Sequence, residues 1–455
     1  MESLVIIIFV LGYLAITLEH NLKIDKMIPA LGMMAVSWAI ISLSHLDVFE
    51  VNTELLELVP SHLEEILLHH LGKTSEILIF LIGAMTIVEI IDYFNGFSAI
   101  KTFVKTNSKV KLLWIFSFLA FILSAIIDNL TATIVLITIL RKIVLKKEDR
   151  LWFAGLIVIG ANAGGAWSPI GDVTTTMLWI GKKVTTAKLI EFLVLPSLLS
   201  MVIPVLIASR LPAFKGNIDD VVPGEVEEER VDKYSSIMLY LGLGAIIFVP
   251  VFKTITHLPP YVGMMLSLAV VAIFAEIFSN ARITLTRIDQ ESEAASNYSP
   301  VHKALSGIEL PSILFFLGIL MAVAALESLG ILFNFAHQMS ESIPLLGTEP
   351  NIAGYKVSDI VILLMGVASA VIDNVPLVAA SIGMFSDPVD SPLWHFIAFA
   401  AGTGGSMLII GSAAGVVAMG MEKINFFWYF KNIAWLALLG FLGGSVTFMF
   451  LRSFL

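Results

Sequence analysis

Long apolar segments separated by short polar stretches run along nearly the whole chain. A helix needs about 20 mainly apolar residues to cross the hydrocarbon core of a membrane. On that basis we place spans at roughly 3–20, 27–44, 76–94, 151–181, 189–210, 236–252, 260–279, 310–330, 393–421 and 427–451. Two further apolar stretches, 112–145 and 357–386, differ because each carries a carboxylate and an amide near its centre. The pattern predicts an all-α polytopic membrane protein with about ten transmembrane helices.

Composition agrees with this class. The 455 residues are 57% hydrophobic and 14% charged, and the mean hydropathy is +0.91, which is far above the values of soluble globular proteins. The formal charge of −10 comes largely from acids in connecting loops, and no basic patch suggests a nucleic-acid partner. The absence of cysteine excludes disulfides and thiolate metal sites. The start of the chain has no cleavable signal pattern, so we expect the first apolar segment to be retained.

The stretch 112–145 is predicted to be a re-entrant hairpin. Lysines precede it and basic residues follow it, so both of its ends have the charge of cytoplasmic loops and lie on the same side. Each arm has only about 16 residues, and two full crossings would push Asp128 to the far surface. A hairpin instead places its tip near the midplane, where non-helical backbone is tolerated if protein or a water-filled cavity surrounds it.

With that choice, most basic loops fall on one side, and both termini are predicted to lie outside. Lys182, Lys183 and Lys188 are the exception to this charge rule. Residues 45–75, which are rich in Glu and His, are expected to form an amphipathic external helix.

An internal duplication is visible in the sequence. Asp128-Asn129 has a near copy at Asp373-Asn374, and each copy is followed by a glycine-rich apolar segment, 160–172 and 401–412. Because an odd number of crossings separates equivalent elements, we predict two inverted-topology repeats, 1–210 and 236–455, joined by a cytoplasmic linker at 211–235. Such repeats place substrate sites at the midplane between interrupted helices.

The two hairpin tips carry the first candidate site residues. An ionisable group at membrane depth is costly and by default indicates a functional site, although Asp and Asn also cap helices at turns. A tip where one helix ends and another begins can gather carbonyl and side-chain oxygens that favour a cation. The tip residues expected to contribute are Asp128, Asn129, Thr131, Thr133, Asp373 and Asn374.

Asn162 and Asp172 lie ten residues apart across a segment whose glycines and proline break the helix. Glycine-lined helix packing explains the glycines but not a buried aspartate. The threonines at 174–176 extend the polar face. In the second half the corresponding polar positions are Thr403, Ser406 and Ser412, and Ser412 aligns with Asp172. Both glycine-rich segments, 151–181 and 393–421, are therefore predicted to be broken helices.

No Lys or Arg occurs within 112–140, 151–181, 357–386 or 394–421. A site with three carboxylates, Asp128, Asp172 and Asp373, and no fixed cation would repel an anionic substrate and requires a cation or protons. We therefore expect a transported hard cation such as Na⁺ or Li⁺, with protons competing for the same oxygens. Competition at a site reached alternately from each side is sufficient for antiport.

Other acids are weaker candidates. Glu89, Asp92 and Glu327 could serve as access or pH-sensing groups, but ordinary solvation at the membrane interface explains them equally well. The histidines have no trusted metal-ligand spacing, and no nucleophile triad, phosphate loop or paired-acid hydrolase arrangement is present. We expect no enzymatic activity and no cofactor. A cation channel is a further alternative.

At 124–133, 160–176, 368–380 and 402–415 the chain resembles the NhaD-type Na⁺/H⁺ antiporters of the ion transporter superfamily. The resemblance implies that Na⁺ or Li⁺ is exported in exchange for protons. It also implies that the protein is a homodimer in the bacterial cytoplasmic membrane. Residues it implies to be essential are Asp128, Asn162, Asp172, Asp373 and Asn374. Arsenite and organic-acid permeases of the same superfamily have similar hairpins and broken spans, and such permeation is the alternative function.

Overall fold

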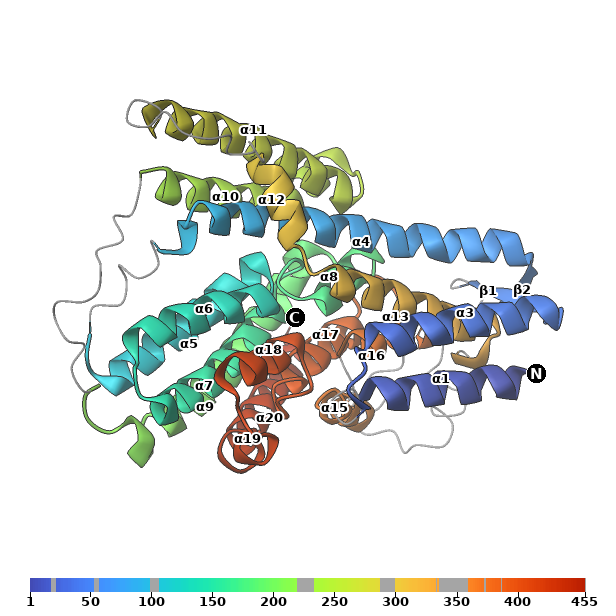
Figure 1. Cartoon of the computed structure of the whole chain (residues 1–455). Coiled ribbons are helices and arrows are strands. Elements are labelled where there is room, and N and C mark those ends of the chain that lie inside the picture. The colour runs from blue at the N-terminus through green and yellow to red at the C-terminus, as the bar shows by residue number, and fades with distance from the viewer. Residues whose placement is uncertain are drawn as a thin grey trace.

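The computed structural model describes residues 1–17, 22–52, 57–98, 106–218, 233–286, 299–332, 334, 359–371, 374–385 and 387–454. Within these ranges the chain is helical apart from one short β-hairpin (Figure 1). The elements of the first half are α1 (Glu2–Thr17), α3 (Met27–Leu43), β1 (Val48–Asn52), β2 (Glu57–Ser61), α4 (Leu63–Tyr93), α5 (Lys109–Ile127), α6 (Asn129–Ile143), α7 (Lys147–Gly165), α8 (Val173–Ile180), α9 (Thr186–Ala208) and the 3₁₀ turn η2 (Pro212–Phe214). Those of the second half are α10 (Lys233–Thr256), α11 (Pro260–Thr286), α12 (Pro300–Gly307), α13 (Leu310–Ser328), α15 (Asp359–Ala368), α16 (Asn374–Met384), α17 (Pro392–Gly404), α18 (Ala413–Glu422), α19 (Phe426–Asn432) and α20 (Ala434–Leu451).

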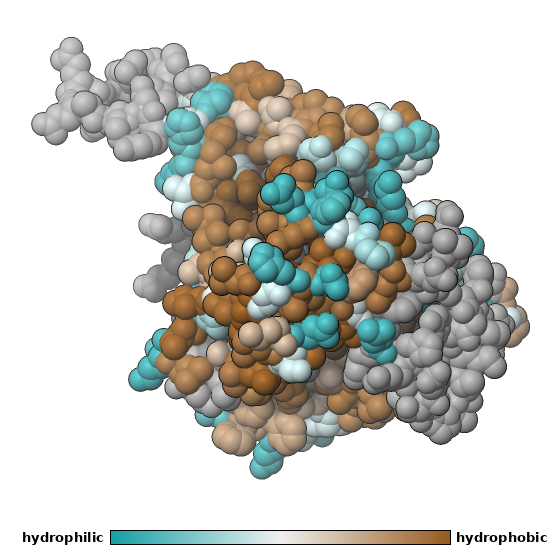
Figure 2. All heavy atoms as spheres, turned by 90° about the vertical axis from the view of Figure 1, so that its right-hand side faces the viewer, coloured by the Kyte–Doolittle hydropathy of each residue, from teal (hydrophilic) through white to brown (hydrophobic). Residues whose placement is uncertain are grey.

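Seven helices among the described residues are long and apolar enough to cross a membrane: α4, α5, α9, α10, α11, α13 and α20. Large apolar side chains on α10, α11 and α20 are exposed, as expected for surfaces that face lipid. Figure 2 shows the end of the molecule that carries the N-terminus and the β-hairpin, with hydrophobic residues over most of it and hydrophilic residues gathered across its centre. The chain is a multi-pass membrane protein.

The region 45–75 differs from the expectation. Residues 45–75 were expected to form one amphipathic helix, but this is wrong. Val48 to Asn52 instead pair antiparallel with Glu57 to Ser61, and α4 begins at Leu63 and runs unbroken for 31 residues. The expected span 76–94 is thus the C-terminal part of a longer helix. β-Branched and aromatic residues favour a strand over 48–51, and no Pro or Gly pair interrupts α4 near its polar start.

Both predicted tips lie between two helices. α5 and α6 meet at Asp128, and α15 and α16 flank the second tip, of which Asp373 lies outside the described residues. The expected arm length of about 16 residues is exceeded by α5, which begins at Lys109, has 19 residues and is long enough to cross a membrane. The two glycine-rich segments are each broken, into α7 and α8 and into α17 and α18.

The predicted linker 211–235 is only partly described, since residues 219–232 lie outside the described ranges. Around the centre, α5 packs on α7, α9 packs on α20, and α3 packs on α13. In Figure 1, α4 runs along one side of this group, and α10 and α11 lie together beyond it. The tips and the breaks therefore come together in the protein interior.

Candidate functional site

The carboxylate of Asp172 is the centre of the site. The side chain is only 2% exposed, and it caps the first turn of α8. The backbone N–H and the hydroxyl of Thr174 both donate to Oδ1, at 2.9 and 3.0 Å. A carboxylate at a helix N-terminus is stabilised by the unpaired N–H groups and by the helix dipole. Capping and function are therefore compatible at this residue.

Two amides, one from each tip, point at the same carboxylate. Asn129 of α6 donates to Oδ2 of Asp172 at 2.7 Å, and Asn374 of α16 donates to Oδ2 at 3.2 Å. These residues are separated from Asp172 by 43 and 202 positions in the chain. The structure thus brings together the two tips and the first break, as the sequence predicted.

Asn162 extends this network into the second half. It is fully buried, and its Nδ2 donates to the Val158 carbonyl at 2.9 Å and to Oγ of Ser412 at 3.0 Å. Its Oδ1 accepts from Asn129 at 3.3 Å. Ser412 caps α18 just as Asp172 caps α8.

Asp128 lies at the junction of α5 and α6 with a backbone φ of 78° and ψ of 160°. Non-glycine residues rarely adopt this conformation, and it costs on the order of 1–3 kcal/mol where the surrounding structure imposes it. Its two carboxylate oxygens accept from the backbone N–H and from the hydroxyl of Thr131, at 2.8 and 2.9 Å. Strain at this position is typical of functional sites.

Asp128, Asp172 and Asn374 line one cavity of about 70 Å³. Most of its other lining side chains are apolar and come from α4, α5, α8 and α13, including Phe80 and Phe315. Oxygen ligands in a small, largely apolar enclosure suit a small hard cation or a proton better than a large anion.

One basic side chain also lines this cavity, which the absence of Lys and Arg from 112–140, 151–181, 357–386 and 394–421 did not predict. Lys26, at the start of α3, is a lining residue, and its ammonium lies 4.4 Å from the centroid of the Phe315 ring. The sequence missed it because Lys26 stands in a polar loop next to Lys23, far from any motif. The packing of α3 against α13 brings it to the cavity.

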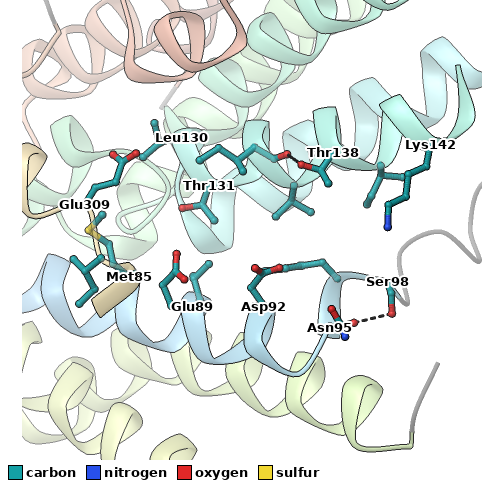
Figure 3. A pocket seen from close by; sticks show the side chains of 17 residues that line it. Met85, Glu89, Asp92, Asn95, Ser98, Leu130, Thr131, Thr138, Lys142 and Glu309 are labelled. Carbon is teal, nitrogen blue, oxygen red and sulfur yellow. Dashed lines mark hydrogen bonds between the residues drawn. The ribbon is translucent and has the colours of Figure 1, made fainter. Parts of the chain in front are cut away.

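A larger cavity of about 340 Å³ lies on the other side of the first tip (Figure 3). Glu89 and Asp92 of α4 point into it, Thr131 lies opposite them, and Glu309 stands at one end. Thr131 is the residue that donates to Asp128. This space, which we call the acidic vestibule, therefore reaches Thr131, the hydrogen-bond partner of the Asp128 carboxylate. Sequence reasoning named Glu89 and Asp92 but not Glu309.

Several predicted residues do not join the site. The Thr403 hydroxyl donates back to the Phe399 carbonyl of its own helix at 2.6 Å, and the Thr133 hydroxyl donates to the Asn129 carbonyl at 2.8 Å. Glu327 ends α13 beside Gly383, within electrostatic reach of Lys183. Burial lowers the pKa of Lys183, which lies in the loop between α8 and α9, and the charge of Glu327 opposes this shift.

Asp373, the third carboxylate of the predicted set, lies outside the described residues. Among the residues that are described, no three His, Cys, Asp or Glu side chains come close enough to hold a metal ion. The described part of the cavity contributes two carboxylates.

Comparisons with known proteins agree that the chain is similar to transporters. A profile of the citrate transporter family matches residues 4–394. The chain is 41% identical to "Sodium/proton antiporter 1" of Arabidopsis thaliana, over 97% of this chain and 71% of that protein. It is 30% identical to "Na(+)/H(+) antiporter NhaD" of Vibrio cholerae, over 98% of this chain and 91% of that protein.

Among solved structures, the YdaH transporter of Alcanivorax borkumensis, described as having an unusual topology, matches with a TM-score of 0.54 at 13% identity. The match covers 93% of this chain and 96% of that one, and it is a likeness of fold alone. With a family profile over most of its length and relatives at 30% identity and above, the chain belongs to the NhaD-type sodium/proton antiporters within the citrate transporter family.

Proposed function

We propose that this protein exchanges Na⁺ or Li⁺ for H⁺ across a membrane, with the two ions competing for Asp128 and Asp172. The observation that carries the proposal is the placement of both carboxylates on one small interior cavity, where two tip amides converge on Asp172. The two relatives described above are both named as sodium/proton antiporters, which supports the same reaction.

The donor set accounts for the competition. Asp172 in its ionised form accepts hydrogen bonds from Asn129, Asn374 and Thr174, so it is held ready for a positive ion. Na⁺ would take carboxylate oxygens of Asp128 and Asp172 together with amide or hydroxyl oxygens around them. A proton on either carboxylate removes the charge that attracts Na⁺. The cavity can therefore hold one or the other, which couples their transport when it opens to alternate sides.

We propose that the two halves are inverted repeats, 1–210 and 236–455, joined by the linker 211–235, and that 112–145 and 357–386 are re-entrant hairpins. Support comes from matched contacts: Ser124 donates to the Ala161 carbonyl, and Ser369, its equivalent, donates to the Ala401 carbonyl. In this arrangement Asp373 would add a third carboxylate to the cation site.

The acidic vestibule is the access path that we propose from the cytoplasmic side. Its acids would raise the local cation concentration, and Thr131 links it to Asp128. We propose that Glu327 and Lys183 lie on the access path from the external side.

We further propose a homodimer in the cytoplasmic membrane with both termini outside. Cross-linking and accessibility labelling of single introduced cysteines would test this, since the chain has no cysteine of its own.

Everted vesicles carrying the protein, with a preformed acid-inside gradient, test the exchange. Addition of Na⁺ or Li⁺ should collapse the gradient, and Asp128→Asn and Asp172→Asn should each abolish this response at unchanged expression. Glu191→Gln is a matched control, because Glu191 is an exposed carboxylate paired with Lys188 at 2.8 Å. It should behave as the wild type.

The alternative, permeation of an organic acid or arsenite, is separated in the same vesicles. Uptake of citrate or arsenite together with a gradient unresponsive to Na⁺ and Li⁺ would overturn the proposal. Cation flux without any proton movement would indicate a channel. Retained Na⁺-dependent exchange in both aspartate variants would remove the site assignment.

A further inference from the structure

The basic side chain on the central cavity is held there by helix packing. Gly318 of α13 faces the backbone of Ala30 in α3 so closely that an added Cβ would lie 2.7 Å from the Ala30 carbonyl carbon. A second contact fixes the same pair of helices, since the indole N–H of Trp38 donates to the Met321 carbonyl at 2.8 Å. These contacts set the rotation and height of α3 against α13.

That register determines where Lys26 points. Lys26 stands one helical turn before Ala30, and Phe315 stands one turn before Gly318, so the two side chains meet at the start of both helices. The ammonium lies over the Phe315 ring at 4.4 Å, and the ring itself is 1% exposed. A cation over a buried aromatic face is attracted by the ring quadrupole. Lys26 can therefore remain charged at the edge of a cavity that is otherwise apolar and acidic.

The start of α3 adds positive potential in the same place. Asp25 Oδ1 accepts from the N–H of Met27 at 2.8 Å, and Lys26 itself is the N-cap residue of α3, while the other N–H groups of the first turn leave the helix end partly positive. Lys26 shares this position and lines the cavity with Asp128 and Asp172. The lining of this cavity thus includes a tethered monovalent cation as well as the carboxylates of Asp128 and Asp172.

We infer that Lys26 sets the cation affinity of the central cavity: as a tethered positive charge it weakens the binding of both Na⁺ and H⁺ there and so sets the range of pH and Na⁺ over which exchange runs. This inference rests on the proposed function. Its physical basis is that a fixed positive charge repels any cation that approaches the same carboxylates, whether that cation is a metal ion or a proton.

Lys26→Met removes the charge and keeps most of the length of the side chain. At alkaline pH, where protons compete little, the half-saturating Na⁺ concentration should fall by about tenfold, as for one unit charge removed from several ångströms away in a partly buried site. Protons should also bind more tightly, so the pH at which exchange is half-maximal should rise. Lys26→Arg, which keeps the charge, should leave both quantities near their wild-type values.

Lys23→Met is the matched control, because Lys23 lies three residues earlier, is exposed and does not line the cavity. It should change neither quantity. A merely structural role for Lys26 would instead lower the maximal rate at every pH and would raise the Na⁺ requirement. If Lys26→Met does not reach the membrane, Phe315→Leu provides a second test, because it removes the ring that holds the Lys26 ammonium. The half-saturating Na⁺ concentration should then fall and the pH of half-maximal exchange should rise, as expected for Lys26→Met.

The outcomes separate this inference from the proposed function. Wild-type vesicles that show no Na⁺-dependent exchange would defeat the proposed function. Wild-type exchange with an unchanged Na⁺ requirement and pH profile in Lys26→Met would defeat the role of Lys26 alone.

Discussion

The two glycine-rich breaks, one between α7 and α8 and one between α17 and α18, share a backbone but differ in chemistry. The residue that caps the second helix has φ −150° and ψ 147° at Asp172 and φ −149° and ψ 155° at Ser412. In both breaks two glycines approach each other closely. An added Cβ on Gly165 would lie 2.6 Å from the Gly171 carbonyl oxygen, and one on Gly405 would lie 2.7 Å from that of Gly411.

The side chains carried on this shared backbone are not equivalent. Asp172 accepts from both tip amides, whereas Ser412 accepts from Asn162 of the other half. The position equivalent to Asn162 is Gly402, which can offer no amide. The comparison teaches that the geometry of the break is a packing requirement met twice, while a carboxylate is placed at one break only.

Replacing Asp172 with serine, the residue at the equivalent position of the second break, should reduce exchange more than any other substitution. Asp172→Ser retains an oxygen that can cap α8 but loses the carboxylate, and it leaves the amides of Asn129 and Asn374 without their acceptor. We expect Na⁺-dependent exchange to fall by at least about a hundredfold, as is usual when one partner of a buried charged hydrogen-bond group is removed. The measurement is the initial rate of gradient collapse in everted vesicles.

Ser412→Ala is the counterpart in the second half. It removes a cap and one hydrogen-bond partner of Asn162, which costs about 1 kcal/mol of stability but no charge, so exchange should fall only a few-fold. Equal losses in Asp172→Ser and Ser412→Ala would contradict the asymmetry that we infer.

The shared backbone should respond equally in both halves. An added Cβ at Gly164 would lie 2.2 Å from the Phe121 carbonyl oxygen, and one at Gly404 would lie 2.1 Å from that of Gly366. Gly164→Ala and Gly404→Ala should therefore each destabilise the protein by about 1–3 kcal/mol or more, because neither close backbone contact can yield without moving a helix. The temperature at which half of the detergent-solubilised protein remains monodisperse reports this.

Gly420, in α18, has no atom within 4 Å of an added Cβ, so Gly420→Ala is the control and should not lower that temperature. A large loss in one half and none in the other would show that the two breaks do not have the same packing requirement.

The sequence was sufficient for the parts of the site that depend on unusual local composition. A carboxylate inside an apolar run has few explanations, so Asp128, Asn129, Asn162, Asp172 and Asn374 could be named, and all five take part in the hydrogen-bonding described above. The breaks followed from the glycines and Pro169 for the same reason.

Features that depend on tertiary packing could not be predicted in this way. Lys26 lines the central cavity because Gly318 lets α3 and α13 approach closely. Glu309 completes the acidic vestibule because α13 starts there. Thr403 had the right composition for a site residue, but its hydroxyl bonds to its own helix, as threonines in helices commonly do. The β-hairpin between α3 and α4 was missed because the charged residues of 45–75 suggested a helical face.

The smallest difference that we expect is between substitutions of the two tip amides, Asn129 and Asn374. Asn129 donates to Asp172 at 2.7 Å and also reaches Asn162, whereas Asn374 donates to the same carboxylate oxygen at 3.2 Å. Loss of a hydrogen bond to a charged acceptor costs about 1.5–3 kcal/mol, so Asn129→Ala should raise the half-saturating Na⁺ concentration by about tenfold or more. Asn374→Ala should raise it by less, because its longer contact contributes less. Asn432, whose amide donates to the Trp428 carbonyl of its own helix at 2.8 Å, supplies the matched control in Asn432→Ala. If Asn374→Ala proves the more damaging of the two, the second tip contributes more to the ion site than its amide alone explains, and the acid beside it in the sequence becomes the first residue to substitute next.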